Sequence, residues 1–334
     1  MTRHSVVLIP GDGIGPEVVE MAQEVIEATG VVIEWKTFEA GTRALEKYGT
    51  PLPHSLLDAI RQSRVALKGP ITTPIGSGFS SVTVALRKEL GLYANLRPVK
   101  SIPGVPARYQ DVDLVVIREN TEDLYSGLER QVDDGTAEAI KRVTRQASLR
   151  IARFAFDYAR RHQRKMVTAV HKANILKLSD GLFLECAREV ATCYPEITYH
   201  ERVVDALCMD LVLDPGRHDV LLCPNLYGDI VSDLAAGLVG GLGLVPAANI
   251  GDGLAVFEAV HGSAPDIAGQ GIANPTALIL AGAMMLFFLG EEEAARKIER
   301  GIQAVYALGR HLTPDVGGTA STREMADAVL SCLC

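Results

Sequence analysis

Short apolar runs alternate with longer amphipathic stretches along this chain, and this alternation limits the possible folds more than any other feature. The short runs have the length and composition of buried strands, and the longer stretches have helical periodicity. Parallel strands need such crossovers, so the pattern predicts an α/β fold with a mostly parallel sheet. Strands are expected at residues 5–9, 31–37, 65–68, 114–118, 165–170 and 220–223, and helices at 17–28, 137–161, 182–194 and 230–238.

The length of 334 residues exceeds what one hydrophobic core usually supports, so two domains are expected. Glycine and proline gather near Arg97-Pro98 and at residues 249–253, where the chain could cross from one domain to the other. We therefore predict a large discontinuous domain of residues 1–98 and 250–334, with a smaller domain of residues 99–249 inserted into it.

Charge and composition exclude several classes of partner. A formal net charge of −8 argues against nucleic acid, which normally requires a basic face. The most apolar stretch, residues 277–289, is short for a membrane span and is expected to be a buried helix. Six cysteines lie outside any CxxC motif, and the first strand begins almost at once. We expect reduced thiols, no targeting segment and a cytoplasmic location.

Residues 11–16 read Gly-Asp-Gly-Ile-Gly-Pro and resemble the dinucleotide fingerprint of classical Rossmann folds. The spacing differs, because Gly15 follows Gly13 by two positions and Pro16 stands where the third glycine would be needed. A tight turn from strand to helix, with proline near the first helical position, explains the motif better. Asp12 remains a candidate neighbour of a cofactor loop.

Three arginines are candidates for binding an anionic substrate, in spite of the acidic composition. Arg87, Arg97 and Arg118 occur in segments that border predicted strands or helices. A guanidinium can hold a carboxylate through two parallel hydrogen bonds, so three of them suit a polycarboxylate. Arg118 ends an apolar strand, which is where open α/β sheets place their ligands. The alternative for each arginine is a solvated surface position.

Acidic residues are candidates for a metal site. Asp229 and Asp233 are four positions apart on one predicted helix face, where like charges repel unless a cation lies between them. Asp205 lies among apolar neighbours, so we expect it to be partly buried and in need of a partner such as a metal. Carboxylate oxygens suit Mg²⁺ or Mn²⁺. Lys172, which follows a predicted strand, is a candidate base.

These residues resemble the metal-dependent decarboxylating dehydrogenases that include isocitrate, homoisocitrate and 3-isopropylmalate dehydrogenases. The resemblance covers nearly the whole chain, through residues 10–17, 68–74, 81–98, 118–127, 171–181, 225–243 and 261–275. It implies a two-lobed isopropylmalate dehydrogenase-like fold with a central, mostly parallel sheet, and not a classical Rossmann fold. It also implies a homodimer whose subunits share each active site.

The resemblance further implies roles for individual residues. Lys172, given by the partner subunit, would deprotonate the substrate hydroxyl, and Tyr125 would protonate the enol after CO₂ leaves. Metal ligands would be Asp229, Asp233 and, from the partner subunit, Asp205. Substrate would contact Ser81, Thr83, Arg87, Arg97, Arg118 and Asn174.

The same resemblance implies NAD as the cofactor. Asp266 and Ile267 stand where NADP-using members carry a Lys-Tyr pair, and a carboxylate repels a 2′-phosphate while accepting bonds from ribose hydroxyls. The adenine would contact Asn274. The full set of residues implied for the cofactor is Ile14, Thr73, Glu258, His261, Gly262, Ser263, Ala264, Asp266, Ile267 and Asn274.

The implied reaction is the NAD-linked oxidative decarboxylation of a malate-type acid, with isocitrate as the first candidate. Thr83 stands where isocitrate enzymes usually carry asparagine, so homoisocitrate or another such acid remains an alternative. A noncatalytic regulatory subunit of a heteromeric isocitrate dehydrogenase is a further alternative, although Tyr125, Lys172 and the three aspartates argue against it. The last alternative is a classical Rossmann hydroxyacid dehydrogenase, which needs no metal.

Overall fold

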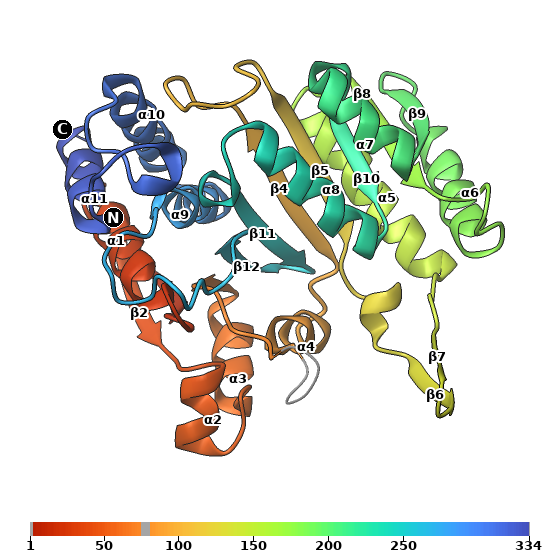
Figure 1. The fold of residues 1–334 in the computed structure, drawn as a ribbon, viewed down its shortest axis with the longest axis horizontal. Coiled ribbons are helices and arrows are strands. Elements are labelled where there is room, and N and C mark those ends of the chain that lie inside the picture. Colours follow the sequence, from red (N-terminus) through yellow and green to blue (C-terminus); the bar gives the residue numbers. More distant parts are fainter. Residues whose placement is uncertain (1–2, 75–80, 334) are drawn as a thin grey trace. The chain divides into compact units, whose positions relative to one another are not determined.

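The structure is a computed structural model that describes residues 3–74 and 81–333. The chain forms two compact units, shown in Figure 1. The terminal unit contains both ends of the chain and comprises Met1–Leu90, Lys100–Gln110 and Ala236–Cys334. The internal unit comprises Gly91–Val99 and Asp111–Ala235.

The terminal unit has five strands in the order β2-β1-β3-β12-β11. All neighbouring pairs are parallel except β11 and β12, which are antiparallel. The strands are β1 (Arg3–Ile9), β2 (Val32–Thr37), β3 (Val65–Lys68), β11 (Pro246–Gly251) and β12 (Leu254–Ala259). The helices are α1 (Gly15–Glu27), α2 (Thr42–Tyr48), α3 (His54–Ser63), α4 (Val82–Glu89), α9 (Thr276–Phe288), α10 (Glu292–Leu308) and α11 (Thr322–Ser331), with short 3₁₀ turns η3 (Leu242–Leu244) and η4 (Pro314–Val316).

The internal unit has the strand order β4-β5-β10-β8-β9, and β5, β10, β8 and β9 run parallel. Two further strands, β6 and β7, form a separate and exposed hairpin (Figure 1). The strands are β4 (Ala94–Lys100), β5 (Asp113–Glu119), β6 (Glu129–Asp133), β7 (Thr136–Ala139), β8 (Met166–His171), β9 (Thr198–Val203) and β10 (Val220–Cys223). The helices are α5 (Arg145–Arg161), α6 (Ser179–Ala191), α7 (Val204–Leu213) and α8 (Asn225–Leu238), with 3₁₀ turns η1 (Leu124–Ser126) and η2 (Pro215–Arg217).

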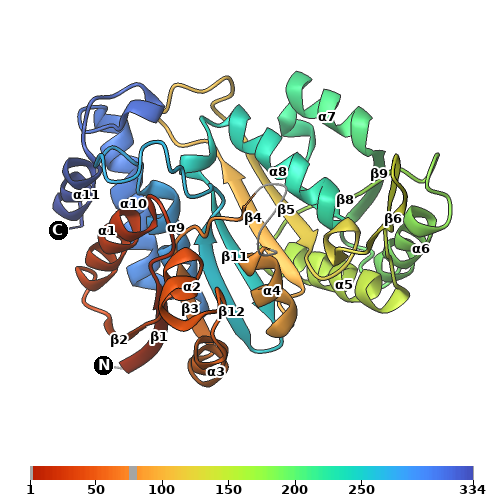
Figure 2. The same ribbon diagram turned by 60° about the horizontal axis from the view of Figure 1, so that its bottom comes forward.

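Helix α9 forms the centre of the terminal unit. It packs on α1 and α10 and against the strands β11 and β12, and Figures 1 and 2 show these helices gathered together. Because α9 is surrounded on most sides, its sequence is apolar around nearly the whole helix. The prediction of a buried helix at residues 277–289 is confirmed. Within residues 3–74 and 81–333, none of the helices combines the length and the apolar character that a bilayer crossing requires.

The predicted α/β class and mostly parallel strands are confirmed, and the strands at 65–68 and 220–223 match in both bounds. The helix predicted over 137–161 is wrong at its start, because Thr136–Ala139 forms β7 and α5 begins only at Arg145. Thr144 caps that helix, since its side chain accepts from the Ala147 N–H. The helix predicted over 230–238 begins earlier, at Asn225.

The predicted domain boundaries also differ from the observed units. Residues 91–98 belong to the internal unit, because β4 pairs with β5 there. Residues 100–110 and 236–249 belong to the terminal unit, because the chain after α8 enters β11, which pairs with β12. The expected discontinuity of the larger unit is present, but the chain crosses between the units at different points.

The glycine motif after β1 is a close-packed turn. Gly13 has a φ of +58°, and a Cβ on it would lie 1.9 Å from the carbonyl oxygen of Ser263. Pro16 lies in the first turn of α1, as the turn interpretation predicted. Glycine is therefore required here because another backbone segment approaches the turn.

Candidate active site

Two arginines of the internal unit converge on one carboxylate. Arg118, at the end of β5, donates to Asp229 Oδ1, and Arg97 Nη2 on β4 lies 3.2 Å from the same oxygen. Both guanidinium groups are buried, with exposed fractions of 5% for Arg97 and 1% for Arg118. The alternative of solvated surface arginines is therefore wrong for both. Buried guanidinium groups that meet at one point offer parallel N–H donors, which suit an anionic ligand.

Neighbouring polar groups and one glycine fix these guanidinium groups in place. Arg97 donates from Nε to Asn95 Oδ1 at 2.6 Å and from Nη1 to Ser232 Oγ at 2.6 Å. Arg118 donates from Nε to Asn225 Oδ1 at 2.8 Å. The sequence interpretation missed Asn95 and Ser232, although a polar residue two positions from Arg97 on a buried strand was an available signal.

Gly228 on α8 makes room for the Arg118 side chain. A Cβ at this position would lie 2.7 Å from both Cβ and Cγ of Arg118. The glycine therefore lets the helix approach β5 closely enough for Asp229 to meet the arginine. Because α8 begins at Asn225, Asp229 lies in the second helical turn and not at the helix terminus. The charge of Asp229 is therefore stabilised by the arginines, and not by the helix dipole alone.

Tyr125, in the turn η1, also contacts Asp229. Its hydroxyl donates to Asp229 Oδ2, and its ring centroid lies 4.8 Å from the Arg118 guanidinium carbon. Burial, together with the hydrogen bond to Asp229, raises the pKa of Tyr125 above its ordinary value. The phenol thus keeps its proton through the neutral range and can act as a proton donor.

Asp233 lies one helical turn beyond Asp229, with its Oδ1 3.4 Å from Arg97 Nη1. Partial burial raises the pKa of Asp233, Arg97 opposes this, and the charge of Asp229 adds to the rise. Two carboxylates on one helix face are hard oxygen donors, which fits the donor chemistry of Mg²⁺ or Mn²⁺. Among the residues that the structure describes, no group of three or more His, Cys, Asp or Glu side chains could hold a metal ion. Further ligands would have to come from elsewhere.

Asp205 is placed differently from the prediction. It was expected to be partly buried, but 67% of its side chain is exposed, because α7 turns Leu207 and Leu211 inward and Asp205 outward. Its partner within the chain is Lys172, whose Nζ lies 2.6 Å from Asp205 Oδ1. The hydrogen bond from Lys172 lowers the pKa of Asp205. Asn174 is exposed in the turn that follows Lys172.

A buried lysine connects the elements that carry these groups. Lys141 Nζ lies 2.6 Å from Asp180 Oδ1 and 3.7 Å from Asp123 Oδ1, and both carboxylates are buried. Asp180 also accepts from the Lys172 N–H at 2.7 Å, and Asp123 accepts from the Leu226 N–H at 2.9 Å, in the first turn of α8. Lys141 therefore supports both the Lys172 turn and the start of the helix that carries Asp229. Sequence reasoning missed this lysine, which lies between an exposed hairpin and a helix.

The terminal unit places Arg87 beside a buried acid. Arg87 Nη2 donates to Glu258 Oε1 at 2.9 Å, Lys68 Nζ lies 2.7 Å from Glu258 Oε2, and Asn249 donates to Glu258 at 2.7 Å. Burial alone would raise the pKa of Glu258, but Lys68 and Arg87 outweigh it and lower that pKa. Glu258, predicted to bind cofactor, thus serves first as an anchor for Arg87. The Arg87 Nε is buried and has no acceptor among the described residues.

Ser81 and Thr83 stand at the beginning of α4. Ser81 caps the helix, since its Oγ accepts from the Val84 N–H at 3.4 Å, and Thr83 lies in the first turn. An uncharged hydroxyl at a helix N-terminus suits a carboxylate of the substrate. Arg87 lies one turn further along the same helix, so α4 and its N-cap together carry three of the residues predicted for substrate.

Most of the predicted cofactor residues lie in loops of the terminal unit. Ser263 accepts from the Ile14 N–H at 2.9 Å and its hydroxyl accepts from Thr72 Oγ1 at 2.7 Å, next to Thr73. Asp266 is exposed in the turn after Ala264. The remaining residues predicted for this loop, Gly262 and Ile267, lie in the same segment.

His261 and Asn274 differ in how free their side chains are. Burial lowers the pKa of His261, and its Nε2 has no partner among the described residues. Asn274 donates to both Tyr306 Oη and Asp315 Oδ2, and its Oδ1 accepts from the Thr276 N–H. Both amide protons are thus committed within the chain, and the adenine contact implied for Asn274 stays a prediction.

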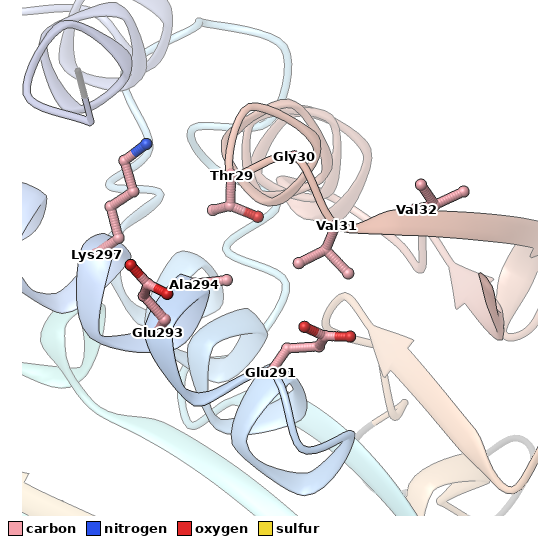
Figure 3. A pocket seen from close by; sticks show the side chains of 8 residues that line it. All are labelled: Thr29, Gly30, Val31, Val32, Glu291, Glu293, Ala294 and Lys297. Atoms are coloured by element: carbon pink, nitrogen blue, oxygen red, sulfur yellow. The ribbon is translucent and has the colours of Figure 1, made fainter. Parts of the chain in front are cut away.

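A separate hollow of about 530 Å³ lies in the terminal unit, between the end of α1 and the start of α10 (Figure 3). Its lining includes Glu291, Glu293 and Lys297, and none of the predicted site residues. It therefore contributes nothing to the arrangement above.

Replacing Lys141 with methionine should lower the free energy of unfolding by about 3–5 kcal/mol, because Asp123 and Asp180 would lose their buried cation. Urea denaturation followed by circular dichroism measures this change. Lys177→Met, at an exposed position of the same unit, is the control and should be nearly neutral. Equal stability of the two variants would contradict the role of Lys141.

The chain is similar to known proteins over almost its whole length. The sequence profile described as isocitrate/isopropylmalate dehydrogenase matches residues 5–329. The NAD isocitrate dehydrogenase catalytic subunit 5 of Arabidopsis thaliana is 55% identical over 98% of this chain and 88% of its own. The 3-isopropylmalate dehydrogenase of Archaeoglobus fulgidus is 52% identical over 98% of this chain and 99% of its own.

Among solved structures, that of isocitrate dehydrogenase from Methylococcus capsulatus superimposes with a TM-score of 0.97, at 55% identity and 99% coverage of both chains. The fold predicted from the resemblance is therefore confirmed. The arginines, acids and tyrosine described above occur in a chain that belongs to the isocitrate/isopropylmalate dehydrogenase family.

Proposed function

We propose that the protein catalyses the NAD-linked oxidative decarboxylation of isocitrate to 2-oxoglutarate and CO₂. The observation that carries the proposal is the convergence of Arg97, Arg118 and Tyr125 on Asp229. Two guanidinium groups suit a polycarboxylate, and the protonated phenol beside them suits a general acid. The identity to NAD isocitrate dehydrogenase subunits supports isocitrate as the substrate.

A divalent cation held by Asp229 and Asp233 would act as a Lewis acid toward the substrate hydroxyl and the neighbouring carboxylate. The hydride would pass from the carbinol carbon to nicotinamide, and the hydroxyl proton would pass to Lys172. When the carbon–carbon bond to the departing CO₂ breaks, the electron pair stays on the substrate as an enolate. Tyr125, whose pKa is raised, would then supply the proton to that carbon.

The second candidate function is the same reaction on another malate-type acid. The 52% identity to an isopropylmalate dehydrogenase is close to the 55% identity to an isocitrate dehydrogenase subunit. Substrate choice would then rest on the hydroxyl groups of Ser81 and Thr83, which both lie at the start of α4. A hydroxyl favours a third carboxylate, whereas an apolar pocket would favour the isopropyl group.

An assay of NADH formation with purified protein tests the proposed reaction. Isocitrate with NAD⁺ and Mg²⁺ should give the highest kcat/KM, compared with homoisocitrate, 3-isopropylmalate, malate and tartrate. Chelation by EDTA should abolish the activity, and added Mg²⁺ should restore it. Faster turnover of 3-isopropylmalate or homoisocitrate would overturn the substrate assignment, and activity that survives chelation would overturn the metal requirement.

We also propose a homodimer in which Lys172 and Asp205 act in the partner's site. Within one chain these two residues pair with each other, and Asp229 and Asp233 have two carboxylates where a metal site needs more ligands. Large apolar side chains are exposed on α7 and α8, the helices that carry the three aspartates. They include Met209, Leu213 and Ile230, with exposed fractions of 54%, 68% and 52%. A second copy of the chain is the proposed cover for this surface.

Mixing two inactive variants tests the shared site. Lys172→Met and Asp229→Asn should each be nearly inactive, and a hybrid dimer should regain one intact site. Refolding the two together from denaturant should therefore restore about a quarter of wild-type activity, since about half of the dimers are hybrids. Lys172→Met with Asp205→Asn is the control, because both changes affect donated residues and no hybrid site is intact. Equal recovery in both mixtures, or none in either, would contradict the arrangement.

The cofactor preference can be tested separately at the exposed turn of the terminal unit. Asp266→Lys with Ile267→Tyr should shift the ratio of kcat/KM for NADP⁺ over NAD⁺ upward by at least about tenfold, because a cation replaces a carboxylate that repels the 2′-phosphate. Initial rates at varied cofactor concentration measure this ratio. Glu293→Lys with Ala294→Tyr, which makes similar changes outside the cofactor loops, is the control. An unchanged ratio in the first variant would contradict the role of this turn.

A further inference from the structure

The carboxylate of Asp12 is buried in the turn between β1 and α1 and is held by backbone donors alone. Its exposed fraction is 7%. Oδ2 accepts from the Thr72 N–H at 2.9 Å, and Oδ1 accepts from the Thr42 N–H at 3.2 Å. No lysine or arginine of the described residues forms an ion pair with it. A buried carboxylate without a cation is costly, so its position calls for an explanation beyond packing.

Asp12 joins three loops that contain residues proposed for the cofactor. Its own N–H donates to Pro70 O at 2.8 Å, so backbone and side chain both hold the segment 69–74. Thr72, held by Asp12, donates from Oγ1 to Ser263 Oγ at 2.7 Å. Ser263 O in turn accepts from the Ile14 N–H at 2.9 Å. These bonds form a closed path, which runs from Asp12 to Thr72, from Thr72 to Ser263, and from Ser263 back to Ile14 in the loop of Asp12.

The packing around this path leaves the carboxylate little freedom. A Cβ on Gly41, which has a φ of +76°, would lie 2.3 Å from Asp12 Oδ2. A Cβ on Gly13 would lie 1.9 Å from Ser263 O. Both glycines are therefore needed for the close approach of these segments. A change of charge or of acceptor geometry at Asp12 therefore acts directly on the closely packed backbone segments around it.

We propose that Asp12 is a positioning residue for the dinucleotide, which acts through Thr72 and Ser263 and does not itself contact the cofactor. It sets the distance between the segment 69–74 and the segment 261–269. Both flank Ile14, and they contain Thr73 and Asp266 of the proposed NAD site. The inference rests on the proposed use of NAD. An asparagine at this position keeps the size but replaces one acceptor oxygen with a donor group, which faces a backbone N–H.

The test is a fluorescence titration of NADH on the purified enzyme, without substrate or added metal. For Asp12→Asn, the Kd for NADH should rise about tenfold, as expected for losing one hydrogen bond to a charged group. KM for NAD⁺ should rise with it, while kcat and KM for the acid substrate stay close to the wild-type values. Thr72→Val removes the next bond of the path and should shift the Kd in the same direction. The two changes combined should cost less than their sum, because both break one path.

Asp219→Asn is the matched control. Asp219 also accepts from backbone donors, the N–H groups of Lys165 at 2.6 Å and Met166 at 3.1 Å, and differs from Asp12 in a further bond from Arg164 at 3.0 Å. It lies in the internal unit, away from the proposed cofactor loops. It should lose stability in thermal unfolding and leave the Kd for NADH unchanged. If Asp12→Asn fails to fold, the Kd of Thr72→Val for NADH still tests the positioning role.

The outcomes separate the inference from the proposed function. Wild-type protein that binds NADH, with unchanged affinity in Asp12→Asn or in Thr72→Val, would overturn the positioning role alone. An equal loss of NADH affinity in Asp219→Asn would also overturn it, since the effect would then be one of general stability. Wild-type protein that binds no NADH would overturn the proposed function, and this inference would fall with it.

Discussion

The carboxylate of Asp229 is the interaction on which the candidate site depends. Arg97 from β4, Arg118 from β5 and Tyr125 from η1 all point their polar groups at it. The three donors come from separate elements, so the carboxylate holds those elements in register with α8. Because the arginines are buried, removing the carboxylate would take an ion-pair partner from both in a poorly solvated place, while Arg97 would keep a second acid, Asp233. A ligand or cation that competes for Asp229 therefore acts on all of them together.

The terminal unit also contains a carboxylate that two cationic side chains contact, with different residues. Glu258 is a buried acid between Lys68 and Arg87, and its pKa is lowered by them in spite of its burial. In the terminal unit two cations thus face one acid, whereas in the internal unit Arg97 and Arg118 face Asp229 and Asp233. With a net charge of −8, anion binding by this chain would depend on these local cations and not on the overall charge.

Within one chain, the groups that the proposed chemistry needs are divided. Tyr125 and Asp229 are in contact, whereas Lys172 pairs with the exposed Asp205. Lys141 connects the supports of both sets through Asp180 and Asp123. A dimer in which the second set serves the partner would explain why Asp205 and large apolar residues of α7 and α8 are exposed. It would also explain why a metal site with enough ligands is missing from the described residues.

The sequence by itself determined the α/β class, the strands β3 and β10, and the buried helix α9. It also named Arg97, Arg118, Asp229 and Tyr125 as candidate site residues, and the structure brings these four into contact. These follow from periodicity, from polar residues at strand ends, and from family resemblance, all of which are local in the chain.

Only the tertiary structure decided which charges meet. Asp205 was predicted to be partly buried and is exposed, since the side that a short helix buries depends on what packs against it. Glu258 was assigned to the cofactor and holds Arg87, and Lys141 had no signal at all. Such pairings join residues far apart in the sequence through a few ångströms of space, and no pattern of spacing along the chain encodes those distances.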